Sequence, residues 1–243
     1  EKTNPCNQHY RILVHDGTPL AIYVFYRLKL DIFTYSTFRL KIPVWIIGIP
    51  CSIGKQGFAV REGMEEILTA DIKLIKGAKL ILNADTVLPG KMGNTLPSAE
   101  LTLKWRDSDH YLSSMRSHYR YRWRKALAKW KDVKIDIVPA GEFDPVMYQQ
   151  YEAVYERSRY KLEKLKLDFF SHLPDSAKII KGSLHDQLLG YAVIMENQDE
   201  LDFLFTGFDY RLNYKFDIYL NLLQEIVSYG LKNNFRVIDF GQT

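Results

Sequence analysis

The sequence predicts a mixed α/β fold made of two halves, each combining a sheet with helices. Three observations support this prediction. Strand-like runs and one helical period share residues 10–82, a longer mixture of both fills residues 101–240, and a loop rich in Pro and Gly separates them. We therefore expect a first domain over residues 1–97 and a second over residues 98–243.

The composition is that of a globular protein, with 47% hydrophobic and 26% charged residues in a chain of 243. A net charge of +4 is too small to indicate nucleic-acid binding unless the charges cluster. The two cysteines, Cys6 and Cys51, lack metal-ligand spacing and favour a reducing compartment. No apolar run approaches the roughly 20 residues that cross a bilayer. Since the chain begins at Glu1 rather than Met, we interpret it as a fragment of a cytoplasmic protein.

In the first half, Asp16-Gly17 between two apolar runs is typical of a hairpin, here with a connection longer than two residues. Gly77 follows a helical period and suits a helix C-terminus. The pattern predicts strands at 10–14, 20–26, 42–50 and 79–82, and a helix at 61–76.

In the second half, Ser108 is expected to cap a helix whose apolar stripe includes Tyr119 and Trp123. Asp144-Pro145 opens another helix, with a capping carboxylate before a proline. The pattern predicts strands at 101–105, 133–138, 178–181, 188–195, 201–208 and 237–240, with helices at 108–130, 145–173 (broken once) and 217–230.

The last two strands flank a helix long enough to be a crossover, so they can be parallel neighbours. Their carboxyl ends would then meet at one edge of the sheet, where open α/β sheets bind ligands. The N-terminus of the helix that begins at Asp217 would face the same edge and favour a phosphate. We expect Thr206, Asp209, Gln242 and Thr243 to converge there.

At this point the chain resembles a known family. The element order is similar to the GNAT acyltransferase fold, and "GFDYRLNYKFDIYLNLLQEIVSYGLKNNFRVIDFGQT" with "DHYLSSMRSHYRYRWRKAL" resembles its Fem-related branch. That branch commonly carries two GNAT-like halves in tandem, a basic helix opening the second half, and a strand ending in a D-F-G-like tip. The resemblance covers residues 100–243, and it covers 10–97 in element order only.

The resemblance implies a role for each residue around the last two strands. The pantetheine of acyl-CoA would lie along residues 205–209 like an added strand. The loop 211–216 would meet its phosphates, and residues 239–243 would face the reacting amine. The implied donor-binding residues are Phe205, Thr206, Gly207, Phe208, Arg211, Lys215 and Asp217, and the implied acceptor-binding residues are Gln242 and Thr243.

Asp239 is the first candidate for the general base and Asp209 is the second. A carboxylate within an apolar strand needs a partner or a raised pKa, and a raised pKa suits a base. The alternative is an ordinary strand-end Asp that accepts backbone N–H groups. By strict alternation, Asp202 and Asp209 fall on opposite faces of their strand, with Asp209 nearer the active edge.

Three further candidates have competing interpretations. Asp217 is most simply a helix N-cap. Tyr191 and Tyr219 could protonate a leaving thiolate, but in a chain with 16 tyrosines either one fits the core or its rim equally well.

The helix at 109–131 is dense in basic residues, including Arg116, Arg120 and Arg124. Such a run is usually a solvated face. Because this one has a single sign, it could also bind an anionic partner: a donor phosphate, tRNA, a polysaccharide precursor or a membrane surface.

The leading interpretation is an N-acyltransferase that uses acyl-CoA, no metal, and a primary amine as acceptor. The segment 210–217 contains no glycine, whereas the family's phosphate loop is glycine-rich; Arg211 and Lys215 would then hold the donor. Two alternatives stay open: aminoacyl-tRNA-dependent transfer to a cell-wall precursor, and a non-catalytic binding module that kept the fold. The six histidines lack metal spacing, and no Walker loop or dinucleotide fingerprint occurs.

Overall fold

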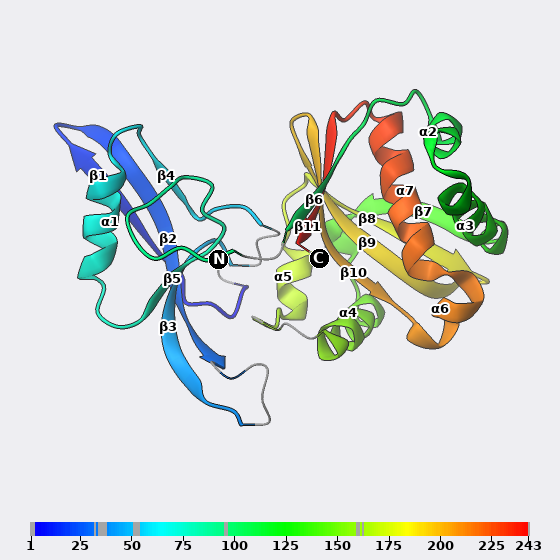
Figure 1. Ribbon diagram of the computed structural model, residues 1–243. Coiled ribbons are helices and arrows are strands. Elements are labelled where there is room, and N and C mark those ends of the chain that lie inside the picture. The colour runs from blue at the N-terminus through cyan, green and yellow to red at the C-terminus, as the bar shows by residue number, and fades with distance from the viewer. Residues whose placement is uncertain are drawn as a thin grey trace. The chain divides into compact units, whose positions relative to one another are not determined.

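The computed structural model describes residues 3–31, 33, 38–50, 54–94, 97–158, 161 and 163–242. Within the chain, two compact units can be distinguished (Figure 1). The first comprises residues 1–97 together with 161–165, and the second comprises residues 98–160 and 166–243. Each unit combines a mixed sheet with at least one helix, so the predicted α/β class is confirmed.

The first unit contains one mixed sheet in the order β1-β2-β3-β5, with β4 also paired to β2. Strands β3 and β5 are parallel and are joined through helix α1, which is the crossover that parallel neighbours require. The elements are β1 (His9–His15), β2 (Thr18–Asp31), β3 (Lys41–Ile47), β4 (Phe58–Val60), α1 (Glu65–Leu74) and β5 (Lys79–Ile81).

The β1–β2 hairpin is tighter than the sequence indicated. Strand β1 ends at His15 and β2 begins at Thr18, so the connection is two residues long. Asp16 and Gly17 both have positive φ, at 46° and 74°, as the turns that match strand twist require. The expectation of a longer connection was therefore wrong.

Helix α1 covers one face of the first sheet. Leu68 and Ile72 from the helix pack with Tyr23 and Ile47 from the strands. Tyr23 is fully buried, and its hydroxyl donates to Asp71 at 2.5 Å. Buried apolar area of this kind is the main stabilising term of a small unit.

The second unit contains a six-stranded sheet in the order β6-β11-β10-β9-β8-β7. Strands β7 to β10 form an antiparallel meander. Strands β10 and β11 are parallel neighbours, as the sequence predicted. The strands are β6 (Ser98–Thr102), β7 (Lys134–Pro139), β8 (Ala177–Leu184), β9 (Gln187–Asn197), β10 (Glu200–Phe208) and β11 (Val237–Gln242).

Helices cover both faces of this second sheet. On one face, Ile226 of α7 packs with Ile238 of β11 in the core. On the other, Phe170 of α5 contacts Phe205 of β10, with ring centroids 5.3 Å apart. The helices are α2 (Ser108–Ser114), α3 (Ser117–Lys129), α4 (Pro145–Arg157), α5 (Leu167–Ser171), α6 (Tyr210–Phe216) and α7 (Ile218–Lys232), and η1 (Ala140–Glu142) is a 3-10 turn.

Two predicted helices are divided. The helix expected at 108–130 breaks at Met115 and Arg116, whose backbones are extended. Its first part is capped by Asp107, whose carboxylate accepts from the His110 amide at 2.7 Å, and Ser108 is the first helical residue. Tyr119, expected in the core stripe, is 53% exposed. The segment from residue 145 forms α4 and α5, with one break as predicted.

Candidate functional site

Strands β10 and β11 are paired for only three rungs. Glu200, Leu201 and Asp202 lie opposite Val237, Ile238 and Asp239. Beyond this point β10 continues to pair with β9, and β11 with β6. Figure 1 shows the two strands diverging from their common start. We call the point just after Asp202 and Asp239 the fork.

Irregularities in both strands explain the fork. In β10, Phe203 and Phe205 lie opposite consecutive residues of β9, so Leu204 is an extra residue. In β11, the register against β6 also shifts between Asp239 and Gln242. A bulge bends its strand and increases the local twist. Each strand therefore turns away from the other at the same level of the sheet.

The carboxylate of Asp239 lies at the fork and is almost fully buried, with 4% exposure. Its Oδ1 accepts a hydrogen bond of 2.8 Å from the amide of Gly241. Gly241 has φ of 73°, a conformation that favours glycine, so the D-x-G spacing has a local structural cause. The bond from the Gly241 amide is what the strand-end interpretation of Asp239 predicts. The same position at the fork is what the catalytic interpretation requires.

Asp202 is the residue that sequence reasoning missed. It is 2% exposed and lies opposite Asp239, so both side chains are on the same face of the sheet. Strict alternation had placed Asp202 and Asp209 on opposite faces, with Asp209 nearer the active edge. Because Leu204 is extra, Asp202, Phe205 and Gly207 share one face instead. No local sequence signal marks the bulge.

Asp209, the second candidate base, is a helix cap. Its Oδ1 accepts from the Arg211 amide at 2.9 Å, and the Arg211 guanidinium binds both carboxylate oxygens at 3.0 and 2.7 Å. The hydrogen bond from Arg211 lowers the pKa of Asp209. A carboxylate held ionised by three hydrogen bonds is a poor proton acceptor, and this geometry opposes the expected role.

The segment expected as a phosphate loop, 211–216, is helix α6. Arg211 is exposed but carries its own counter-ion, Asp209. Lys215 is also exposed, and its ammonium has no carboxylate within 4.0 Å among the described residues. Of the two expected donor-binding cations, Lys215 is thus the one with uncompensated charge.

Asp217 does not cap α7 with its side chain. It has a left-handed backbone with φ of 48°, and its carboxylate binds Lys129 of α3 at 2.8 Å. Asn213 supplies the missing cap, because its Oδ1 accepts from the Tyr219 amide at 3.2 Å. The N-cap interpretation of the Asp217 side chain was therefore wrong.

The side chains of residues 205–208 belong mostly to the core. The Thr206 hydroxyl donates to the Tyr191 carbonyl at 2.7 Å. Gly207 lies under the Tyr191 ring, where an added Cβ would come within 2.5 Å of it. Phe208 is 7% exposed and packs with Ile218 of α7. What β10 can offer a ligand beyond the fork is backbone, on the edge that no described strand covers.

The two candidate tyrosines differ in access. Tyr191 is fully buried, its hydroxyl donates to the Met147 carbonyl at 2.9 Å, and burial raises its pKa well above the ordinary value. It has no surface for a substrate and is a core residue. Tyr219, in the first turn of α7, is 40% exposed, with its ring 6.0 Å from that of Phe208.

The remaining predicted residues have mixed outcomes. Arg116 and Arg124 are exposed. Arg120 instead binds the Ser113 carbonyl at 2.8 Å at the end of α2. The side chain of Gln242 and all of Thr243 lie outside the described residues, so their expected convergence with Asp239 stays a prediction.

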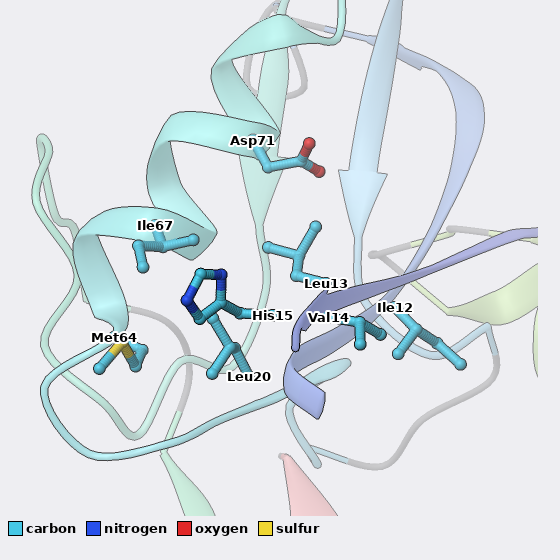
Figure 2. A pocket seen from close by; sticks show the side chains of 8 residues that line it. All are labelled: Ile12, Leu13, Val14, His15, Leu20, Met64, Ile67 and Asp71. Carbon is cyan, nitrogen blue, oxygen red and sulfur yellow. The ribbon is translucent and has the colours of Figure 1, made fainter. Parts of the chain in front are cut away.

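A second feature, in the first unit, is an open pocket of about 610 Å³ beside β1 and α1 (Figure 2). Its lining is mainly apolar, including Ile12, Val14 and Ile67. Its one carboxylate, Asp71, is bound by Arg11 at 2.9 Å and by the Tyr23 hydroxyl. These contacts occupy the Asp71 carboxylate, and the fork, where two strands expose backbone beside two buried carboxylates, is the better candidate.

Over the described part of the chain, no group of three or more His, Cys, Asp or Glu side chains could hold a metal ion. Among the same residues, no helix combines the length and the apolarity of a membrane span.

Comparison with known proteins gives a family and a fold. The family described as "Acetyltransferase (GNAT) domain" matches residues 113–243, more than half of the chain. No curated protein matches the sequence.

Solved structures that are similar over nearly the whole chain include FemX and L-PGS. FemX has a TM-score of 0.56 and 12% identity, over 98% of this chain and 80% of its own. L-PGS from Bacillus licheniformis has a TM-score of 0.57 and 10% identity, over 97% of this chain and 68% of its own. At these identities the likeness establishes the fold alone. Because both likenesses span the two halves, the predicted tandem GNAT-like architecture is confirmed.

Proposed function

Because this chain belongs to the GNAT acetyltransferase family, we propose that it is an N-acyltransferase whose reaction takes place at the fork between β10 and β11. The observation that carries the proposal is the fork itself. Two parallel strands separate directly after a rung that holds two buried carboxylates, Asp202 and Asp239. Paired strands would leave no backbone free for a donor, whereas separated strands expose one edge of each.

We place the acyl donor along the uncovered edge of β10, beyond Asp202. Its amide and carbonyl groups can bind an extended chain as a strand would, which is the mode of β-augmentation. Backbone N–H groups on this edge would also polarise the carbonyl of the acyl group. Lys215 and the N-terminal turn of α7 are the groups that would meet donor phosphates.

Asp239 is the proposed proton acceptor. The acceptor nitrogen attacks the acyl carbonyl carbon, a C–N bond forms, and the bond from that carbon to the donor sulfur or oxygen breaks. The nitrogen loses its proton to the Asp239 carboxylate, through a water molecule where the buried side chain is out of reach. The leaving group gains a proton from Tyr219 or from solvent. Asp202 lies opposite Asp239 on the same rung.

Acyl-CoA is the first candidate donor, because the family description names an acetyltransferase. The second candidate is an aminoacyl ester on tRNA, with transfer to a cell-wall precursor. The exposed basic face of α3 favours this alternative, since phosphate contacts come from Lys and Arg. One structure similar to this chain is that of a putative lysylphosphatidylglycerol synthetase, a name that describes a lysyl group joined to a lipid.

The proposal is tested by donor binding and turnover. The whole purified chain is titrated by calorimetry with acetyl-CoA and with aminoacyl-tRNA, and then assayed for acyl transfer to a panel of primary amines. We expect binding of one donor and turnover that depends on Asp239. If neither donor binds, the alternative of a non-catalytic module is favoured and the proposal fails.

A further inference from the structure

The most one-sided charge in the second unit lies on α3 and α6. From Arg116 to Lys131 the sequence contains no Asp or Glu. The exposed side chains here include two tyrosines and several cations. We define the α3–α6 surface as Tyr121, Arg122, Arg124, Lys125, Tyr214 and Lys215, all exposed.

The packing of α3 explains why these cations face outward. Ala126 and Trp130 bury the inner side of the helix. On the side toward α6, the Lys129 ammonium binds Asp217 at 2.8 Å and the Tyr214 carbonyl at 3.2 Å. The Asp217 carboxylate, which lies between α3 and α6, is therefore already paired with Lys129.

The other four cations differ from Lys129. Among the described residues, no carboxylate lies within 4.0 Å of Arg122, Arg124, Lys125 or Lys215. Four uncompensated charges of one sign on adjacent helices repel one another, so they attract an anionic surface.

The tyrosines indicate what kind of anionic surface this is. Tyr214 is 93% exposed and Tyr121 is 68% exposed, each beside cations. A tyrosine ring with a polar tip is typical of the membrane–water interface. The Lys129 ammonium lies over the Tyr214 ring, 5.9 Å from its centre. The ammonium therefore occupies one of the two ring faces on which a nucleic-acid base would stack. A bilayer interface leaves this contact intact.

We propose that the α3–α6 surface docks the protein onto an anionic phospholipid bilayer. The contact is electrostatic and peripheral. The apolar side of α3 is already buried in the core, so it is not available for insertion among the acyl chains. Lys215 is also assigned to the donor, and the cations of α3 would also serve the tRNA alternative, so the test below includes RNA as a competing ligand.

The test is co-sedimentation of the whole chain with vesicles of phosphatidylcholine alone and with vesicles containing one third phosphatidylglycerol. The test variant is Arg122→Glu with Lys125→Glu. The matched control is Lys73→Glu with Lys76→Glu, which changes the net charge equally at exposed positions of the first unit. Circular dichroism melts show whether each variant is folded. If a double variant is unfolded, a folded variant with only one of its two substitutions is used instead.

We expect binding to the anionic vesicles only, lost with added salt because the contact is screened. The α3 variant should bind at least ~10-fold more weakly, since each basic residue near such a surface contributes favourably, and the control should bind like the wild type. Equal binding to neutral vesicles, or equal binding by both variants, would overturn the proposal. A single-stranded RNA oligonucleotide is measured in parallel; tight RNA binding that the α3 variant abolishes, without vesicle binding, would assign the surface to nucleic acid instead.

Discussion

Asp202 and Asp239 lie directly opposite each other on the last paired rung of two parallel strands, and both carboxylates are almost fully buried. Burying a carboxylate is costly unless it is paired or hydrogen-bonded. Asp239 is stabilised in part by the Gly241 amide. Both residues lie at the point where the two strands separate and expose backbone, and this position is why we place the chemistry there.

Asp239→Asn should abolish most turnover while the fold persists. The Asn side chain keeps an oxygen that can accept from Gly241, but it cannot take a proton. We expect kcat to fall by about 100-fold or more, the usual contribution of a general base. The matched control is Glu100→Gln, which removes the exposed carboxylate opposite Asp239 on β6. Equal turnover in Asp239→Asn and wild type would exclude Asp239 as the base.

Lys215→Ala should weaken donor binding more than Arg211→Ala does. Lys215 has uncompensated charge, whereas Arg211 is already bound to Asp209. We expect KM for the donor to rise roughly 10-fold for Lys215→Ala with kcat little changed, as for an interaction made equally in the ground and transition states. Steady-state kinetics with varied donor checks this, and a larger effect of Arg211→Ala would reverse the assignment.

Gly207→Ala should destabilise the second unit. An added Cβ would come within 2.5 Å of the Tyr191 ring, which is fully buried and cannot move away easily. Overpacking of this kind costs about 1–3 kcal/mol in the free energy of unfolding. The control is Gly141→Ala, where an added Cβ meets nothing within 4 Å. Urea denaturation measures both, and equal midpoints would contradict the packing described for Tyr191.

Asp209→Asn should reduce the sensitivity of folding to acid. The bond from Arg211 lowers the pKa of Asp209 below its ordinary value of 3.8, so the unfolded chain binds this proton more readily. The carboxylate therefore stabilises the fold above that value, and the contribution is lost as the pH falls toward its lower folded pKa. Unfolding followed from neutral pH to below the ordinary value should show a smaller decrease for the variant. An unchanged pH dependence would show that Asp209 is not held ionised.

Much of the second unit could be predicted because its signals are local. The crossover length between 208 and 237 predicted parallel neighbours. Asp239 could be proposed from the sequence because an ionisable residue in an apolar strand is conspicuous.

The missed features depend on tertiary contacts. The bulge at Leu204 arises from how β10 pairs with β9. Strict alternation, which ignores this bulge, would place Asp202 and Phe205 on opposite faces of the sheet. Asp217 has a typical capping residue type, but Lys129, 88 positions earlier, binds its carboxylate instead. Tyr191 became a core residue because Gly207 makes room for its ring. None of these partners can be identified from sequence spacing.

The central claim, that the acyl donor lies along β10 at the fork, is tested most directly by amide hydrogen exchange of the whole chain with and without donor. Acetyl-CoA and aminoacyl-tRNA are added separately. We predict that one of them slows exchange in residues 203–208, because the donor would bond to the uncovered edge of β10. Unchanged exchange in this segment while the donor is bound elsewhere would contradict the claim.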